Sequence, residues 1–226
     1  MHNSLFNSMD FTELGKVSDE WTDFVRNAPA LGHSKLVPGM DPVAARALVE
    51  SSRARPSDAD LSAKGLNVRT FTWTDPTTTQ KLQFRLFMPP EAAANPTQVF
   101  PLYLYFHGGG FLFGSIDSDT ADCARISTSS SIMVLSANYR HTDTHTFPSQ
   151  HDDAWSALQF VLSSPPELTQ VDPTRILVAG ASAGANLALV TALRAGAEVW
   201  SFSPLSSPIR LSSLNPRPDP NTQPGR

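Results

Sequence analysis

The sequence predicts an α/β fold in which a mainly parallel sheet is flanked by helices. Two observations carry this prediction. Between residues 61 and 202, apolar runs of strand length alternate with segments of helical periodicity. Two of the apolar runs, at residues 100–106 and 175–179, have the composition of buried strands, and each ends at a glycine-containing turn. Because parallel strands are joined by helical crossovers, this alternation is typical of a sheet with helices on its faces.

The chain divides by composition into three segments. The first is expected to be helical, because capping residues precede apolar stretches at residues 18–26 and 41–52, and residues 53–62 have the composition of a polar connector. The last is rich in serine and proline, and its small apolar surface cannot offset the entropy lost on ordering it. We predict an N-terminal helical segment at 1–60, a sheet-and-helix core at 61–202 and a disordered tail at 203–226.

Five strands and three helices are expected in the core. The strands are placed at residues 66–73, 81–88, 100–106, 132–136 and 175–179. The helices are placed at residues 117–127, 151–162 and 183–197. Alternating apolar residues in the second strand predict that the first two strands form an antiparallel outer part of the sheet. The stretches 89–96 and 169–174 are expected to be a loop and a turn, and 199–202 a weak further strand.

Ser182 lies at the turn between the last predicted strand and the helix that follows it. It is the centre of the pattern G-x-S-x-G, with Gly180 and Gly184 two positions before and after it. A serine at a sharp strand-to-helix turn has a strained backbone, so these two neighbours must be nearly free of side chain. The hydroxyl then stands clear of the sheet, at the positive end of the helix dipole. Ser182 is a candidate nucleophile; the alternative is a small-residue turn with a chance serine.

A second glycine-rich turn follows the strand at residues 100–106, with the sequence His107-Gly108-Gly109-Gly110-Phe111. Glycines leave backbone N–H groups uncovered and able to approach a substrate, which is what a developing oxyanion requires. A phosphate-binding loop would need G-x-G-x-x-G or a G-K-[ST] ending, and neither is present. HGGG at one strand end, upstream of G-x-S-x-G at another, is the α/β-hydrolase combination of oxyanion loop and nucleophile elbow.

These motifs resemble those of the hormone-sensitive-lipase-like branch of the α/β hydrolases, which are serine carboxylesterases. The resemblance extends from about residue 66 to about residue 196 and includes Asn138-Tyr139-Arg140 and Asp152-Asp153-Ala154-Trp155. It implies the α/β-hydrolase fold, a small-molecule ester as substrate, and no cofactor or metal. It implies that Ser182 attacks the ester carbonyl. The groups that would hold the oxyanion are the N–H groups of Gly108, Gly109 and Ala183. The supporting motif positions are His107, Gly110, Gly180 and Gly184.

The chain departs from the resembled family at two small positions. The family usually carries aspartate before the serine and glycine three positions after it, whereas this chain has Ala181 and Ala185. Both changes keep the side chains at the turn small. In the family, the N-terminal region supplies part of a helical cap over the active site. From the residues alone, two helices packed on the edge of the sheet are an equal alternative.

The acid and the base of a catalytic triad are not found in the sequence. In α/β hydrolases both follow the serine, whose hydroxyl needs a base to take its proton. No histidine follows Ser182, and the later acids, Glu198 and Asp219, lie at a predicted helix end and in a proline-rich stretch. His141 and His145 follow a strand end, but two solvent-exposed histidines in a polar loop are the simpler interpretation, and they bring too few ligands for a metal site.

The resemblance therefore implies that the family's late strands are missing. We expect a truncated or mis-spliced gene product, with a natural short form as the alternative, and doubtful activity. The nucleophile strand would then be an uncovered sheet edge, prone to self-association or aggregation. Two other functions stay open. One is a non-catalytic, ligand-binding relative, as the gibberellin receptors are, and the other is a dehydratase or acyltransferase variant of the fold.

Composition excludes several other classes. The chain has 226 residues and a net charge of −4 without a basic cluster, so no nucleic-acid partner is expected. Cys123 is the sole cysteine, which rules out an intramolecular disulfide, and it is expected to be a small buried residue of a helix. The N-terminal residues lack the pattern of a signal peptide, and no apolar run reaches membrane-spanning length. The expected location is the cytoplasm.

Overall fold

The computed structural model describes residues 16–27, 39–52 and 55–201. The chain forms two compact units, Met1–Gly39 and Met40–Arg226. The first unit contains α1 (Asp19–Asn27), whose N-terminus is capped as predicted, because the Ser18 hydroxyl accepts a hydrogen bond from the Trp21 N–H at 3.2 Å. The second unit contains the sheet and every other described helix. The predicted division of the chain at residues 60 and 202 stays a prediction.

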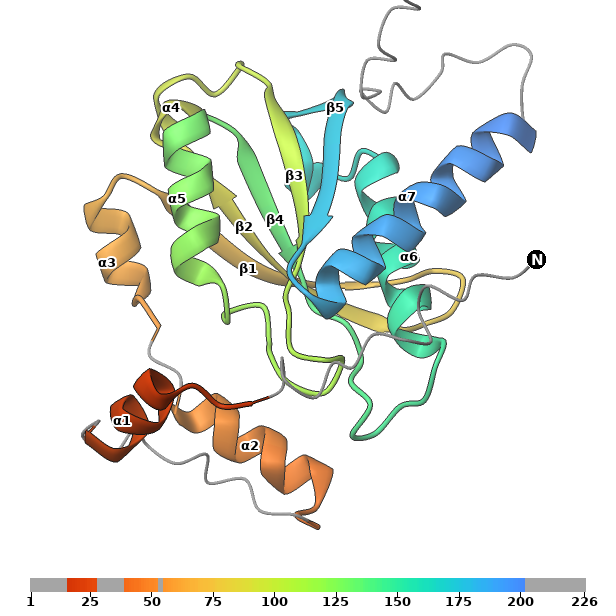
Figure 1. Cartoon of the computed structure of the whole chain (residues 1–226). Coiled ribbons are helices and arrows are strands. Elements are labelled where there is room, and N and C mark those ends of the chain that lie inside the picture. The colour runs from red at the N-terminus through yellow and green to blue at the C-terminus, as the bar shows by residue number, and fades with distance from the viewer. Residues whose placement is uncertain (1–15, 28–38, 53–54, 202–226) are drawn as a thin grey trace, which may run out of the picture. The chain divides into compact units, whose positions relative to one another are not determined.

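The sheet has five strands in the order β1-β2-β4-β3-β5 (Figure 1). They are β1 (Asn67–Thr74), β2 (Lys81–Met88), β3 (Phe100–Phe106), β4 (Met133–Ala137) and β5 (Val171–Gly180). The first two strands are antiparallel, as predicted, and β2 is antiparallel to β4. β3 is parallel to both β4 and β5, so the carboxyl ends of β3 and β5 meet at the same edge of the sheet.

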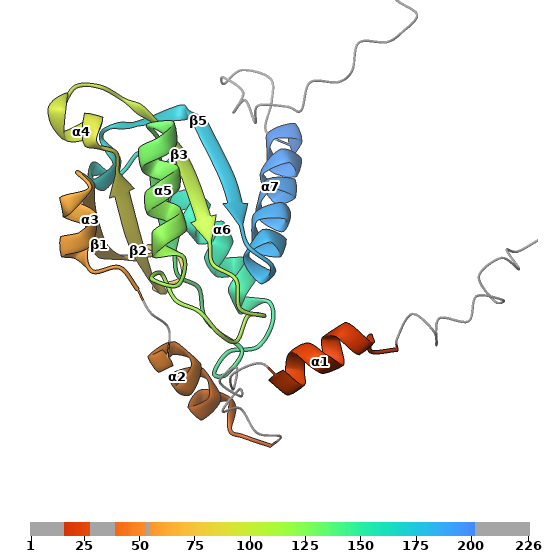
Figure 2. The same ribbon diagram turned by 60° about the vertical axis from the view of Figure 1, so that its left-hand side comes forward.

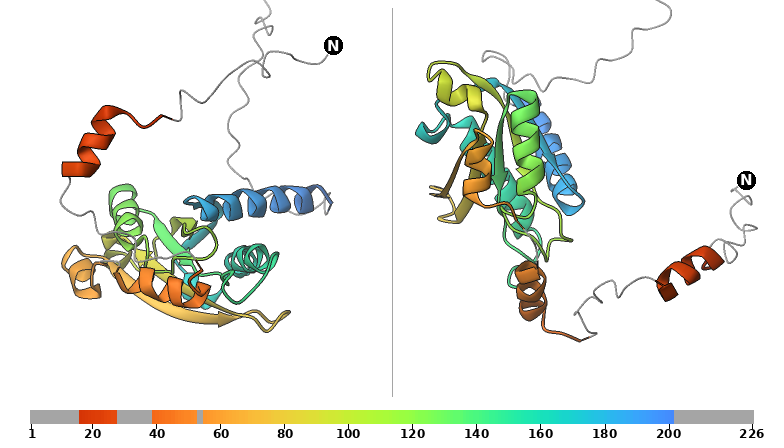
Figure 3. Two further views of the ribbon diagram at one scale, coloured as in Figure 1. Left: turned by 60° about the horizontal axis from the view of Figure 1, so that its bottom comes forward. Right: turned by 90° about the vertical axis from the view of Figure 1, so that its left-hand side faces the viewer.

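Helices cover both faces of the sheet. In the second unit they are α2 (Pro42–Ser52), α3 (Asp58–Ala63), α4 (Pro90–Ala94), α5 (Thr120–Ser130), α6 (Ser149–Leu162) and α7 (Ala183–Ser201), with a 3₁₀ turn at Pro166–Leu168. α5 lies on one face, and α6 and α7 lie on the other (Figures 2 and 3). None of the described helices is both long and apolar enough to cross a membrane.

Two apolar cores follow from the alternation of side chains along the strands. The larger core joins Phe84, Leu104 and Leu135 of the sheet to α6 and α7, and the smaller joins Phe87 and Val134 to α5 and α3. Cys123 belongs to the smaller core and is buried on α5, as predicted. Burial raises the pKa of its thiol to about 12, so the thiol stays protonated and unreactive at neutral pH.

Four local predictions were wrong. The predicted connector at 53–62 contains α3, where Ser57 and Asp60 form a capping box that satisfies two backbone N–H groups. The predicted loop at 89–96 contains the short α4, which has proline in its first turn. The predicted turn at 169–174 already contains the start of β5, because Val171 pairs with Phe100. The weak strand predicted at 199–202 is the end of α7 as far as Ser201. The tail predicted at 203–226 lies outside the described residues.

Candidate active site

Ser182 lies in a tight turn between β5 and α7, with a left-handed backbone (φ 51°) that is strained for a residue with a side chain. The turn closes directly into the helix, because the Ala185 N–H donates to the Ser182 carbonyl at 3.0 Å. A Cβ on Gly180 would lie 2.7 Å from the carbonyl oxygen of Phe106, and a Cβ on Gly184 would overlap the same oxygen. Both glycines therefore permit the close approach of β3 to the elbow.

The HGGG loop lies against the elbow. A Cβ on Gly108 would lie 3.1 Å from the carbonyl oxygen of Ala181, and the Ala181 N–H donates to Phe106 at the end of β3 at 3.2 Å. Ala183 is the first residue of α7, where backbone N–H groups have no partner within the helix. Within residues 55–201, the N–H groups of Gly108, Gly109 and Ala183 donate to no acceptor. Three backbone N–H groups without a hydrogen-bond acceptor among these residues therefore lie in the oxyanion loop and the elbow, which are in contact.

His107 joins the oxyanion loop to the neighbouring strand end. Its Nδ1 lies 2.9 Å from the Gly108 carbonyl oxygen, and its Nε2 lies 3.2 Å from Oδ1 of Asn138. Its ring stacks on Tyr139 with the centroids 4.4 Å apart, and the Tyr139 hydroxyl donates to the His107 carbonyl at 2.9 Å. Burial lowers the pKa of His107, so the ring is neutral at pH 7. These contacts position the loop and leave His107 badly placed to exchange protons with solvent.

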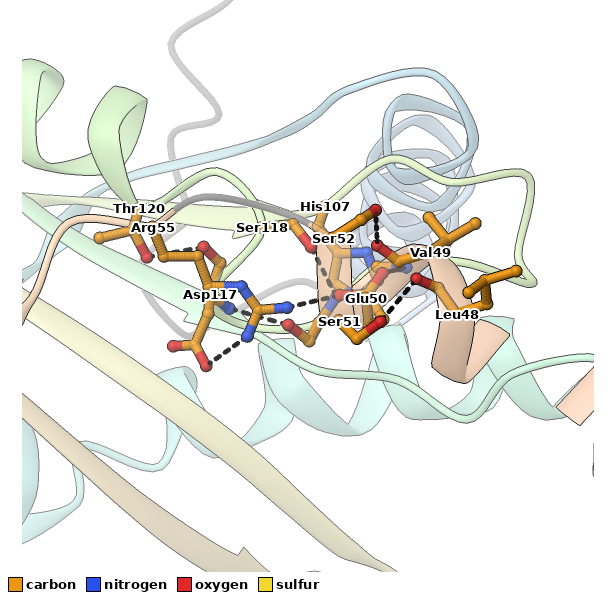
Figure 4. A network of polar contacts seen from close by, with 12 residues as sticks. Leu48, Val49, Glu50, Ser51, Ser52, Arg55, His107, Asp117, Ser118 and Thr120 are labelled. Carbon is orange, nitrogen blue, oxygen red and sulfur yellow. Dashed lines mark hydrogen bonds and ion pairs between the residues drawn. The ribbon is translucent and has the colours of Figure 1, made fainter. Parts of the chain in front are cut away.

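A polar network ties α2 to the end of the oxyanion loop (Figure 4). The Glu50 carboxylate accepts the N–H of Gly114 at 2.7 Å, and Arg55 bridges Glu50 at 2.6 Å and Asp117 at 3.4 Å. Arg85 on β2 pairs with the other side of Asp117 and with Asp58. Sequence analysis missed this network. Its partners are up to 64 residues apart, and nothing local marks Glu50 as different from other helix-surface acids.

Two further motif segments come together at the start of α6. Arg140 donates from its backbone N–H and from its guanidinium to the Asp153 carboxylate at 2.7 to 3.0 Å. These hydrogen bonds raise the pKa of Arg140, and Asp153 is 1% exposed. The pair fixes the loop after β4 against α6, beside the candidate nucleophile helix.

This combination of sheet order, elbow and oxyanion loop has a counterpart among known proteins. A family model described as the alpha/beta hydrolase fold matches residues 103–223, which is more than half of the chain. The chain belongs to this family. Its curated relatives and structural neighbours include carboxylesterases, which support the predicted hormone-sensitive-lipase-like branch of the α/β hydrolases.

Three curated relatives illustrate the range of the family. Esterase LipI of Mycobacterium tuberculosis is 38% identical over 112 residues, which are 49% of this chain and 34% of the relative. Carboxylesterase NlhH of the same species is 36% identical over 48% of this chain and 32% of the relative. The gibberellin receptor GID1 of rice is 37% identical over 50% of this chain and 32% of the receptor. The chain thus spans about a third of the length of each of these α/β hydrolases.

Solved esterase structures share the architecture. An esterase of Pyrobaculum calidifontis superposes with a TM-score of 0.62 and 28% identity, over 80% of this chain and 55% of that one. The thermostable carboxylesterase EstE1, cloned from a metagenomic library, superposes with a TM-score of 0.56 and 30% identity, over 72% of this chain and 53% of that one. The mixed five-stranded sheet flanked by helices is therefore an α/β-hydrolase arrangement.

The two histidines of the loop after β4 have different environments. His145 is exposed, as predicted, and its Nδ1 contacts the Thr144 hydroxyl at 2.9 Å. The prediction that His141 is exposed was wrong, because its ring stacks on those of Tyr139 and His107, with centroids 5.1 and 5.4 Å away, and is 3% exposed. Burial, followed by Arg46 and His107, lowers the pKa of His141 to about 3, so it is a poor proton acceptor at pH 7. Within the described ranges, no group of three metal-binding side chains occurs.

Sequence analysis assigned no role to His151, yet it contacts both halves of the candidate site. Its Nε2 lies 3.0 Å from Oδ1 of Asn186, one helical turn after Ser182, and its ring packs 5.9 Å from that of Phe111 in the oxyanion loop. His151 therefore ties α6 to both segments. The only signal was its helical spacing from Trp155, since the Asn186 contact spans 35 residues. In the part of the chain that the structure describes, no histidine makes a hydrogen bond to the Ser182 hydroxyl.

Proposed function

We propose that this chain carries the nucleophile and the oxyanion hole of a serine carboxylic-ester hydrolase that acts on small acyl esters. One observation carries the proposal. Ser182 stands at a strained elbow at the N-terminus of α7, and the uncommitted N–H groups of Gly108, Gly109 and Ala183 belong to the segments that meet there. Such donors, held in place before the reaction, are what stabilises a developing oxyanion. The esterase relatives support the same reaction class.

In the proposed reaction, Oγ of Ser182 forms a bond to the ester carbonyl carbon, and the carbonyl electron pair moves to the oxygen. The three backbone N–H groups hold that oxyanion. The tetrahedral intermediate then collapses, the alcohol leaves with a proton, and water hydrolyses the acyl-enzyme. The proton of Ser182 needs a base, and α/β hydrolases supply it from a histidine later in the chain than the serine. When a triad member is absent, about 10³–10⁴-fold catalysis over water remains from the oxyanion hole and binding.

The test is turnover of p-nitrophenyl butyrate by the purified 226-residue chain. The Ser182→Ala variant removes the nucleophile, and Ser129→Ala is a matched control, because Ser129 is exposed on α5, outside the candidate site. We expect weak turnover, which is lower in Ser182→Ala than in the parent chain and unchanged in Ser129→Ala. Equal turnover by all three proteins would mean that Ser182 is not an activated nucleophile in this chain.

A second function is favoured by one observation, the absence of a histidine that hydrogen-bonds Ser182 among the described residues. The rice receptor GID1, 37% identical over 115 residues, is a relative named for ligand recognition. The chain would then bind a small apolar ligand at the same edge of the sheet without turning it over. Saturable binding of butyrate esters that persists in Ser182→Ala, together with no serine-dependent turnover, would favour this function.

A further inference from the structure

Glu50 of α2 reaches the end of the oxyanion loop, and both of its carboxylate oxygens have partners there. Oε1 accepts the backbone N–H of Gly114 at 2.7 Å, and Oε2 pairs with the Arg55 guanidinium at 2.6 Å (Figure 4). The Glu50 side chain is 17% exposed. Hydrogen bonds to an ionised group are roughly twice as strong as neutral ones, so this carboxylate holds the Gly114 backbone firmly.

Gly114 packs directly against the peptide bond that joins Gly108 to Gly109. A Cβ on Gly114 would overlap Nδ1 of His107 and would lie 2.6 Å from the Gly108 carbonyl oxygen. Nδ1 of His107 lies 2.9 Å from the same carbonyl oxygen. The oxygen end of this peptide bond is therefore held between His107 and the residue that Glu50 fixes.

The other end of that peptide bond is the Gly109 N–H, one of the proposed oxyanion donors. The peptide bond is trans, so its C=O and N–H point in opposite directions, and contacts that fix the carbonyl also fix the direction of the N–H. The Phe113 N–H donates to the Gly109 carbonyl at 2.8 Å, which closes a tight turn that leads into Gly114. A displacement of Gly114 is therefore passed on to the Gly109 N–H by two routes.

We propose that Glu50 is a positioning residue of the oxyanion hole, because its hold on Gly114 sets the direction of the Gly109 N–H. This inference rests on the proposed ester hydrolysis, in which that N–H binds the oxyanion. A displacement of about 1 Å at the reacting groups can cost about 100-fold in rate. The loss should appear in kcat and not in KM, since the oxyanion forms only after the ester is bound.

The first measurement is turnover of p-nitrophenyl butyrate by the 226-residue chain and its Glu50 variants, each corrected with its own Ser182→Ala background. Glu50→Ala removes both contacts and should lower kcat by about tenfold or more with KM unchanged. Glu50→Gln should lose less. Its amide has only one acceptor oxygen, so it can serve Gly114 but not Arg55 as well.

The matched control is Glu91→Ala. Glu91 is an exposed glutamate of α4 that accepts a hydrogen bond from Ser131 at 3.1 Å, outside the candidate site. This variant should keep the kcat of the parent chain. A folded Glu50→Ala protein with unchanged kcat, or with a raised KM alone, would overturn the inference, because a contact that only attaches α2 would lower the melting temperature without changing kcat.

The second measurement is NMR of selectively labelled glycine amides, which needs no turnover. Glycine labelled with ¹³C at the carbonyl and with ¹⁵N selects the amides of Gly109 and Gly110, since only these two glycines follow another glycine. Carbonyl-labelled phenylalanine with ¹⁵N-glycine selects Gly114, the only glycine that follows phenylalanine. Glu50→Ala should shift the signals of both Gly114 and Gly109, and Glu91→Ala should shift neither.

The two measurements separate this inference from the proposed function. A parent chain without Ser182-dependent turnover would contradict the proposed function, and the Gly109 signal would still decide the role of Glu50. A shift of Gly114 without one of Gly109 would overturn the inference. If Glu50→Ala does not fold, Glu50→Asp keeps the charge on a side chain one methylene shorter, loses the Gly114 contact, and should shift the same two signals.

Discussion

The two ends of the sheet, at β1 and β5, differ in how far their apolar side chains are buried. At the β1–β2 end, Phe160 of α6 is 1% exposed and packs among Phe71, Trp73 and Phe84, with ring centroids 4.8 to 5.9 Å apart. At the β5–α7 end, large apolar side chains stand in solvent. The most exposed are Leu177 at 53%, Leu189 at 59% and Leu193 at 65%.

The difference teaches how each edge strand is protected. The exposed positions of β1 include Arg69, Thr70 and Thr72, which are polar and discourage pairing with another chain. β5 is the last strand of the described sheet, and its exposed positions include Leu177. An edge with free backbone N–H and C=O groups and apolar side chains invites a further strand. We therefore expect the purified chain to self-associate, with the β5 edge of a second copy as the partner.

The largest expected effect is at the covered end. Phe160→Ala removes a buried ring from the centre of an aromatic cluster and leaves a cavity, so the free energy of unfolding should fall by about 3–5 kcal/mol. Urea denaturation followed by circular dichroism measures it. Leu193→Ala on α7 is the control at the open end, where the side chain is mostly exposed and the change should stay within about 0.5 kcal/mol. Similar losses in both variants would mean that the two ends are equally covered.

The second prediction addresses the open end. Leu177→Lys places a charge in the middle of the β5 edge and should weaken self-association about 100-fold, which corresponds to about 2.7 kcal/mol. Sedimentation velocity over a range of concentrations measures the change. Thr72→Lys on β1 is the matched control, because it adds the same charge to the protected edge and should leave association as it is in the parent. A parent chain that stays monomeric at all concentrations would contradict the expectation that the β5 edge associates with a second copy.

The smallest expected change in stability comes from the buried hydrogen bonds of Asp75, at the β1–β2 end of the sheet. Asp75, in the turn after β1, accepts a hydrogen bond from Ser156 of α6 at 2.6 Å and others from the N–H groups of Thr77 and Thr78. Burial raises the pKa of Asp75, but these hydrogen bonds together lower it by more. The net pKa is therefore below its ordinary value of 3.8. Asp75→Asn should lower the free energy of unfolding at pH 7 by about 1–2 kcal/mol.

The difference in unfolding free energy between the parent and Asp75→Asn should depend on pH with a definite sign. Because the pKa of Asp75 is lower in the folded state than in the unfolded state, its contribution is present above about pH 4 and is lost as pH falls through the folded-state pKa. The stability gap between the parent and Asp75→Asn should therefore narrow only below about pH 4. Denaturation curves at a series of acidic pH values check it. A gap that is constant down to pH 2 would show that the ionised carboxylate contributes nothing.

The features that the sequence alone determined are local ones. Apolar runs, and alternation in the second strand, placed all five strands to within a few residues, because a strand buried on both faces is continuously apolar and a half-buried one has a period of two. The small residues around Ser182 identified the elbow for a local, steric reason. Gly180 and Gly184 are needed because the turn leaves no room for a side chain at either position. The two short helices were missed because five or six residues carry too little periodicity to detect.

Tertiary structure alone decided which polar residues are buried and what they touch. His141 and His145 stand in one polar segment, yet only His141 is buried, because its ring stacks on those of His107 and Tyr139. Glu50 reaches Gly114 across 64 residues, and His151 reaches Asn186 across 35. Such contacts depend on where separate elements meet, and that is set by the packing of the whole sheet. Local sequence therefore determined the elbow and the oxyanion loop, whereas the polar contacts that hold these segments in place depend on the tertiary structure.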